Sequence, residues 1–291
     1  MFYNSKSSKT SMYEQPRRRA LLATTALLTA LTLSACATAP GAKPTASNAP
    51  QSDASLRDVA ISSTKSQDYI AAAAYWGSLY DKNSKDVEAA LNYSKALRQI
   101  GSIQQALSVM QRADLANPNN ADILAEYGKV LASSGHPDQS YAILTRANQI
   151  KPDDWTVLSA MGVALDQLGR YSDAQKEYDA ALKIAPDNPS VLTNLGLSYA
   201  IEGDLDKAEA TLRKAVANPK ANASARQNLA VVLGLQGKFD EATRLARADL
   251  PTNVADNNID YLREMLSQPA LWKQMESLDD TKPAKTAAAT Q

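Results

Sequence analysis

The sequence predicts an all-α fold in which antiparallel helix pairs stack one after another into a solenoid. Its composition favours helix over strand, because alanine is abundant, only 2 residues are phenylalanine, and runs rich in Val, Ile, Thr or Tyr are few. A stronger indication is that glycine recurs every 34 residues, at Gly101, Gly135, Gly169, Gly203 and Gly237. A fixed period of this length is typical of repeat proteins, whose units bury their apolar faces against their neighbours.

Further columns with the same period indicate how the helix pairs pack. Small residues recur at Ala106, Ser140, Ala174, Ala208 and Ala242, at Gly128, Gly162 and Gly196, and at Ala113, Ala147, Ala181 and Ala215; prolines recur at Pro118, Pro152 and Pro186. Small side chains permit a close approach where two helices cross. We expect the Gly169 column to end first helices in left-handed backbone and the Pro152 column to end second helices. These columns resemble the tetratricopeptide repeat (TPR), which implies a right-handed superhelical solenoid.

The N-terminus has the features of a secretory signal, and we assign residues 1–35 to a signal peptide that is removed. Three arginines at 17–19 give it a positive start, residues 20–33 are apolar, and small residues end it. The apolar run of roughly 14 residues is too short to cross a bilayer core of about 30 Å as a helix. Translation could begin at Met1 or at Met12, and both starts imply the same compartment.

Cys36 is the only cysteine of the chain and follows Leu33, Ser34 and Ala35, an ending that resembles a bacterial lipobox. A disulfide is not available to it, because there is no second cysteine. We therefore expect a covalent diacylglycerol and a fatty acyl group on Cys36, and no other cofactor. Two or more acyl chains hold a protein stably, so the membrane contact would be a lipid anchor. By resemblance to proteobacterial lipoproteins, Ala37 implies delivery to the outer membrane, facing the periplasm.

The rest of the chain divides by composition and by the repeat period. Residues 36–54 are rich in Pro, Ala, Ser and Gly and predict a flexible tether. Residues 55–86 predict a degenerate N-terminal repeat, with Trp76 in its interhelical core. Residues 87–250 predict an array of about five repeats, which begin near 87, 121, 155, 189 and 223. Residues 251–279 predict capping helices, because a terminal repeat otherwise leaves an apolar face in water, and residues 280–291 predict a disordered tail.

The sequence offers no set of residues for catalysis. His136 is the single histidine and falls in a predicted turn. Without a second histidine or a spare cysteine, zinc sites, Cys/His dyads and Ser/His/Asp triads cannot form, and no glycine-rich phosphate loop is present. We expect neither an enzyme, nor a metal site, nor a small-molecule substrate. The signal carries five basic residues and one acidic residue of a chain with 31 of each, so its removal leaves a mildly acidic protein, which argues against nucleic acid.

A TPR solenoid instead presents a concave groove lined by the first helix of each repeat, where a peptide can bind. By repeat position, the lining changes from charged to apolar along the chain and includes Asn92, Lys95, Arg98, Glu126, Lys129, Val163, Asp166, Asn194, Leu197, Ile201, Asn228, Val231 and Leu235. The last six form the predicted peptide-binding groove, in which the two asparagines hydrogen-bond a peptide backbone and the apolar residues receive side chains. The alternative is that the C-terminal helices cover these residues as ordinary core.

The segment at residues 226–266, "RQNLAVVLGLQGKFDEATRLARADLPTNVADNNIDYLREML", goes beyond the general repeat. Together with the lipobox, it resembles the TadD family of tetratricopeptide lipoproteins in tight adherence (Tad/Flp) pilus systems. The resemblance implies a non-enzymatic scaffold that binds a protein partner, the outer-membrane secretin or another Tad pilus component, in a pilotin-like or assembly role. The alternative is an envelope TPR lipoprotein that acts as an adaptor for proteases or cell-wall hydrolases.

Overall fold

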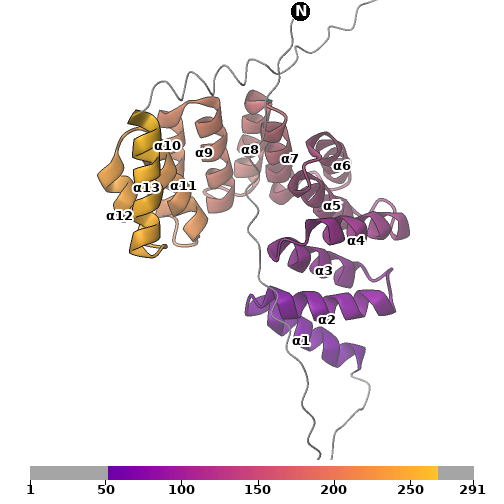
Figure 1. The fold of residues 1–291 in the computed structure, drawn as a ribbon. Helices are drawn as coiled ribbons and strands as arrows, with labels where there is room; N and C mark the ends of the chain where they lie inside the picture. The colour runs from indigo at the N-terminus through magenta and orange to yellow at the C-terminus, as the bar shows by residue number, and fades with distance from the viewer. Residues whose placement is uncertain (1–51, 268–291) are drawn as a thin grey trace, which may run out of the picture. The chain divides into compact units, whose positions relative to one another are not determined.

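The computed structural model describes residues 52–267, which form thirteen α-helices and no strands (Figure 1). None of these helices is both long and apolar enough to cross a membrane. The predicted signal, Cys36, most of the tether and the residues after 267 lie outside the described range. The helices are α1 Asp53–Lys65, α2 Tyr69–Lys82, α3 Val87–Gln99, α4 Ile103–Ala116, α5 Ala121–Ser133, α6 Pro137–Ile150, α7 Trp155–Gln167, α8 Tyr171–Ile184, α9 Pro189–Glu202, α10 Leu205–Ala217, α11 Ala223–Leu235, α12 Phe239–Ala246 and α13 Thr252–Ser267.

The helices pack in chain order, each against the one before it, as Figure 1 shows from α1 to α13. The first helices of neighbouring repeats also touch, in the series α3, α5, α7, α9 and α11. The hydrophobic core is continuous along the described repeats, since Ile143 and Tyr199 each pack against two of its clusters. This arrangement is the all-α TPR solenoid that the period predicts.

Each first helix begins one residue after an asparagine or aspartate, at the residue where the period places a repeat. The side chains of Asp86, Asn120, Asp154, Asn188 and Asn222 accept hydrogen bonds from backbone N–H groups of the first turns. Such caps satisfy donors that have no partner within the helix and stabilise each start by about 1 kcal/mol. These residues are themselves spaced by 34, a column that our sequence reasoning overlooked.

The turn inside each repeat depends on glycine, as predicted. Gly101, Gly135, Gly169, Gly203 and Gly237 all have positive φ, between 72° and 99°. The residue after each glycine donates a backbone hydrogen bond to the carbonyl five residues earlier, for example from Arg170 N–H to Leu165 O at 2.9 Å. This pairing closes the helix end in left-handed backbone, where a Cβ would be strained.

The crossing of the two helices in a repeat depends on a different glycine column. A Cβ placed on Gly162 would lie 2.5 Å from the ring of Tyr178, and one on Gly128 would lie 2.4 Å from Leu144. On the opposing helix, Ala174 is fully buried. The prediction that small residues permit close approach is therefore confirmed at these positions.

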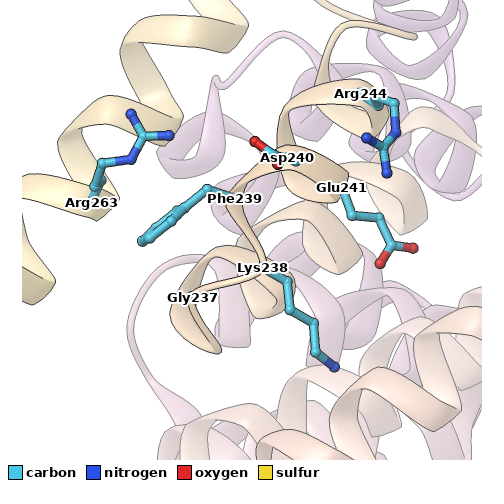
Figure 2. Close-up of a pocket in the computed structure, with 7 residues that line it drawn as sticks. All are labelled: Gly237, Lys238, Phe239, Asp240, Glu241, Arg244 and Arg263. Carbon is cyan, nitrogen blue, oxygen red and sulfur yellow. The ribbon is translucent and has the colours of Figure 1, made fainter.

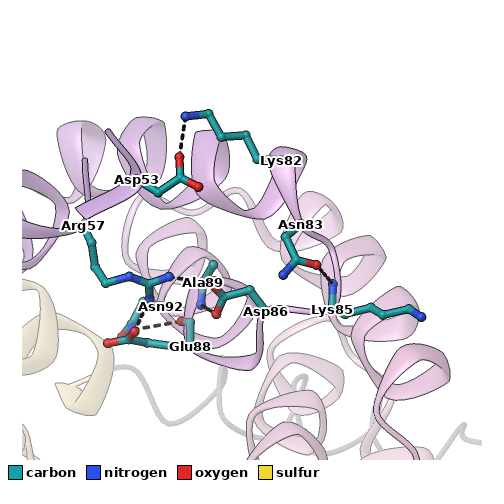
Figure 3. A network of polar contacts seen from close by, with 9 residues as sticks. All are labelled: Asp53, Arg57, Lys82, Asn83, Lys85, Asp86, Glu88, Ala89 and Asn92. Atoms are coloured by element: carbon teal, nitrogen blue, oxygen red, sulfur yellow. Dashed lines mark hydrogen bonds and ion pairs between the residues drawn. The ribbon is translucent and has the colours of Figure 1, made fainter. Parts of the chain in front are cut away.

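The N-terminal helix pair, α1 and α2, joins the first regular repeat through charged side chains (Figure 3). Arg57 of α1 pairs with Asp86, at 2.6 Å, and with Glu88 at the start of α3. Lys82 of α2 pairs with Asp53 of α1 at 2.7 Å. Beneath this surface, Trp76 is 1% exposed, which confirms its predicted place in the core.

The C-terminal end of the described array departs from the regular repeat. Helix α12 has only 8 residues, and α13 packs against both α11 and α12. A Cβ added to Gly234 of α11 would come within 2.8 Å of the side chain of Leu262 on α13. Arg247 also pairs with Asp256 of α13 at 2.7 Å. Helix α13 thus covers the apolar face that α11 would otherwise expose.

Candidate functional site: a cavity on the first-helix face

The first helices α5 and α7 form most of the wall of an open cavity of about 410 Å³, to which α3 and α9 contribute one residue each. Its size is that of a typical ligand pocket. The cavity is lined by Arg98, Lys129, Ala132, Ser133, Trp155, Thr156, Ser159, Ala160, Val163, Gln167 and Asn194. We call it the α5–α9 cavity.

Most of its lining residues occupy the repeat positions that predict the groove. Lys129 stands two repeats before Leu197, Val163 stands two repeats before Val231, and Gln167 stands one repeat before Ile201. The six predicted groove residues continue the same columns toward the C-terminus. The α5–α9 cavity includes Asn194 and lies one to two repeats nearer the N-terminus than the other five residues.

Lys129 supplies the least compensated charge in the cavity. Its Nζ donates a hydrogen bond to Thr156 Oγ1 at 3.2 Å, and no carboxylate within residues 52–267 lies at ion-pair distance from it. Burial lowers the pKa of the Lys129 ammonium below its ordinary value, although the nearby carboxylate of Glu126 acts against this. A cation in this setting gains from any anion that enters the cavity.

Arg98 also lines the cavity, but its charge is already matched. Its Nε and Nη2 donate to the two carboxylate oxygens of Glu126, at 2.8 Å and 3.3 Å, and Ser94 Oγ donates to one of them at 3.1 Å. The expectation that Glu126 lines the groove is wrong, because this residue is only 2% exposed. An unpaired carboxylate at that depth would be costly, and Arg98 of the preceding repeat supplies the partner.

Asp166 is a second correction to the predicted lining. Its carboxylate accepts hydrogen bonds from Tyr178 of α8, at 2.8 Å, and from Ser198 of α9, at 2.6 Å. One oxygen is therefore used within the repeat of Asp166, and the other is used in the contact with the next repeat. Burial raises the pKa of Asp166 above its ordinary value, since it favours the neutral acid.

The six predicted groove residues are placed as follows. Asn194 lies in the cavity wall and donates to Ser159 Oγ at 3.1 Å, so one of its donors is used within the protein. Leu197, Asn228 and Leu235 are half-buried. Ile201 and Val231 are 59% and 45% exposed, so the described helices leave both in solvent. Whether the six bind a peptide stays a prediction.

The sequence reasoning missed most of the cavity wall. Ala160 and Ser133 could have been found from their columns, because they precede Asn194 and Ile201 by one and two repeats. Trp155 could have been noticed because its residue type differs from that at the same position of the other repeats. It is the first residue of α7, where the other repeats have Val, Ala or Pro, and this departure marks one repeat as special.

A second cavity, of about 340 Å³, lies between the α11–α12 turn and α13 (Figure 2). Three of its five charged residues are already engaged. Arg263 lies over the ring of Phe239, 4.9 Å from the centroid, and Glu241 pairs with Arg213 at 2.7 Å. Lys238 is likewise bound to a glutamate of α10. The two remaining charged residues of the lining, Asp240 and Arg244, carry opposite charges, so this surface has no excess of unpaired charge of one sign.

The fold and the cavity define a helical repeat scaffold. Within residues 52–267 there is no group of three or more His, Cys, Asp or Glu that could hold a metal ion. His136 is exposed at the start of α6, as its place in a turn predicts. A hollow lined by apolar, amide, hydroxyl and cationic groups is suited to binding a peptide rather than to bond chemistry.

Comparison with known proteins identifies the family. One tetratricopeptide repeat family model matches residues 64–122, 128–189 and 159–225, and a second tetratricopeptide repeat model matches residues 222–252. The chain therefore belongs to the tetratricopeptide repeat family, whose members are protein-binding scaffolds. The matching models describe repeats and not a catalytic family. No curated protein matches the chain at a significant level.

Solved structures agree on the fold. TTC0263, a thermophilic TPR protein of Thermus thermophilus, is 19% identical, with a TM-score of 0.57 over 62% of this chain and 98% of its own. A tetratricopeptide repeat protein from Parabacteroides merdae is 12% identical, with a TM-score of 0.64 over 74% of this chain and 86% of its own. At these identities the likeness concerns the fold alone.

Proposed function

We propose that the protein is a scaffold that holds a segment of a protein partner along the first-helix face of its repeats. The observation that carries this proposal is the α5–α9 cavity, because it is an open hollow built from the helices that line the groove of a TPR solenoid. Ile201 and Val231 extend the same face with exposed apolar side chains. Exposed apolar residues that continue a cavity are a common feature of protein-binding surfaces.

We further propose that the scaffold is lipid-anchored through Cys36 in the outer membrane and faces the periplasm. The support is the lipobox-like ending before Cys36 and the Pro/Ala/Ser-rich sequence after it. The variant Cys36→Ser should accumulate as an unlipidated precursor and leave the outer-membrane fraction, measured by fractionation and by labelling with a radioactive fatty acid. A variant that is still processed and still bound to the outer membrane would overturn the anchor.

In that compartment we propose a role in assembling the Tad/Flp pilus, as pilotin-like support of the outer-membrane secretin. The support is the likeness of residues 226–266 to the TadD family, a segment that in this protein comprises most of α11, all of α12 and most of α13. A scaffold on a lipid anchor could hold a secretin subunit close to the membrane while the multimer forms. The partner and the pilus both come from the resemblance.

The test is to delete the gene and to compare secretin multimers in outer-membrane fractions, on gels that keep the multimers intact. We expect the multimers to disappear, to return with the wild-type chain, and not to return with Cys36→Ser. Multimers that persist in the deletion strain would contradict the pilotin-like role. A protease or cell-wall hydrolase that co-purifies with the protein in that case would favour the adaptor function instead.

A further inference from the structure

We propose that the α5–α9 cavity selects a partner segment in which a carboxylate adjoins a bulky apolar side chain, with Lys129 receiving the carboxylate. This inference rests on the proposed function and names the chemistry of the partner at that site. Trp155, Ala160 and Val163 would receive the apolar side chain.

The charge of the cavity wall favours a carboxylate. Two of its eleven residues are cationic, and no aspartate or glutamate is among them. Arg98 is bound by Glu126, whereas Lys129 has only the hydroxyl of Thr156. Of the acids nearby, Glu126 is held by Arg98, and Asp154 caps α7 through a 2.9 Å bond from the Thr156 backbone.

A carboxylate that reached the Lys129 Nζ would therefore form the first full ion pair of that lysine in the described structure. Burial already disfavours the ammonium form of this residue, as its lowered pKa indicates. A ligand anion would compensate the buried charge and make a charge-assisted hydrogen bond at the same time. A neutral amide oxygen in the same place could accept a hydrogen bond from the ammonium, but it could not compensate the charge.

The apolar part of the wall lies beside Lys129. Trp155 is half-buried, so part of its indole faces the cavity, and Ala132, Ala160 and Val163 add small apolar surface. The alanines keep the hollow open, because larger side chains would fill it. An aromatic wall with a few polar groups is the usual design of a pocket that orients a ligand.

The repeat columns also assign a direction to the partner. In successive repeats the column of Lys129 continues as Val163, Leu197 and Val231, so the cation is replaced by apolar groups toward the C-terminus. Ile201 likewise follows the polar Gln167 in its column. The carboxylate of a bound segment would therefore lie over α5, and the segment would continue over α9 and α11 with apolar side chains.

The test uses peptide selection on the purified full-length protein in detergent. Phage-displayed random 12-residue peptides are selected on the wild type, and the enriched peptides are synthesised with amidated ends and measured by fluorescence anisotropy. We expect the enriched sequences to carry Asp or Glu next to Leu, Phe or Trp. Replacing that Asp by Asn, or Glu by Gln, should weaken binding about tenfold or more, the usual effect of losing a charge-assisted hydrogen bond.

The matched variants are Lys129→Gln and Lys95→Gln. Lys95 occupies the same column one repeat earlier, but it is exposed and does not line the cavity. Lys129→Gln should abolish the preference for the acidic peptide over its amide counterpart, and Lys95→Gln should preserve it. Circular dichroism and Tm confirm that both variants remain folded.

Three outcomes would overturn the inference. The first is enrichment of peptides without a carboxylate preference, the second is an acidic preference that survives Lys129→Gln, and the third is that no peptide is enriched. If such peptides still bind and lose affinity with Leu197→Glu, the proposed function stands and only the carboxylate assignment fails. If no peptide is enriched, the carboxylate assignment is overturned. The proposed function also fails if, in addition, no protein partner can be cross-linked to the first-helix face. Peptides with a free C-terminus, compared with their amides, show whether a terminal carboxylate is preferred over a side chain.

Discussion

Replacing Gly162 by alanine is expected to destabilise the protein although alanine is the better helix former. Gly162 lies in the middle of α7, and a Cβ there would come within 2.5, 2.6 and 2.9 Å of three ring atoms of Tyr178. Ordinary contacts of a Cβ begin near 3.4 Å. Tyr178 cannot easily retreat, since it is 1% exposed and its hydroxyl donates to Asp166 at 2.8 Å.

Two opposing effects determine the size of the change. Overpacking a well-packed core costs about 1–3 kcal/mol, whereas removing glycine from a helix interior gains roughly 0.5–1 kcal/mol. Because three ring atoms are too close and the ring is held by a hydrogen bond, the upper part of the overpacking range applies. We expect a net loss of about 1–2 kcal/mol in the free energy of unfolding.

The assay is urea unfolding followed by circular dichroism, with constancy of the slope m checked because repeat arrays can lose two-state behaviour. Tyr178→Ala provides the control background, since it removes the ring that the new methyl group would meet. In that background Gly162→Ala should become neutral or stabilising. A Gly162→Ala variant that is more stable than the wild type, or one with the same loss in both backgrounds, would show that the contact with Tyr178 does not set the change in stability.

Three further predictions concern charge. Glu126→Ala should lower the free energy of unfolding in urea by roughly 2–4 kcal/mol, because it leaves Arg98 without its partner in a nearly buried site. Glu126→Gln should lower it less. Equal and small losses for the two variants would contradict this. Burial raises the pKa of Asp166 in the folded state, so the folded state binds more protons than the unfolded state at pH values near that pKa. The contribution of Asp166 to the free energy of unfolding therefore falls as the pH rises from the ordinary pKa through the raised one. The free energy of unfolding of Asp166→Asn, relative to that of the wild type, should therefore be lower at pH 4 than at pH 7. A difference between the two proteins that does not depend on pH would exclude the effect. Leu197→Glu should leave Tm nearly unchanged and weaken partner co-purification, whereas a large fall in Tm would show that Leu197 is core.

The repeat period predicts most of the described fold because it reflects local requirements. Left-handed turns need glycine, and close helix crossings need small residues. The roles of Gly169 and Gly162 can therefore be predicted from the sequence alone. The cap column of Asp86 and Asn120 was equally visible but was overlooked. Two different residue types share it, since either side chain can accept the capping bonds.

The site is less predictable because it depends on contacts between repeats. Glu126 and Lys129 are three residues apart on α5, yet the first turns into the core and the second lines the cavity. The difference arises because Arg98 of the preceding repeat reaches Glu126. The cavity wall likewise includes Trp155, which no repeating pattern indicates.

Photo-crosslinking in living cells shows whether the first-helix face binds a protein partner. A photoreactive phenylalanine replaces Ile201 on α9 or, as a matched control, Ile184 on the second helix α8; these isoleucines are 59% and 40% exposed. If the first-helix face binds the partner, a discrete protein adduct forms at position 201 and not at position 184. Adducts at position 184 alone, or equally at both positions, would contradict it.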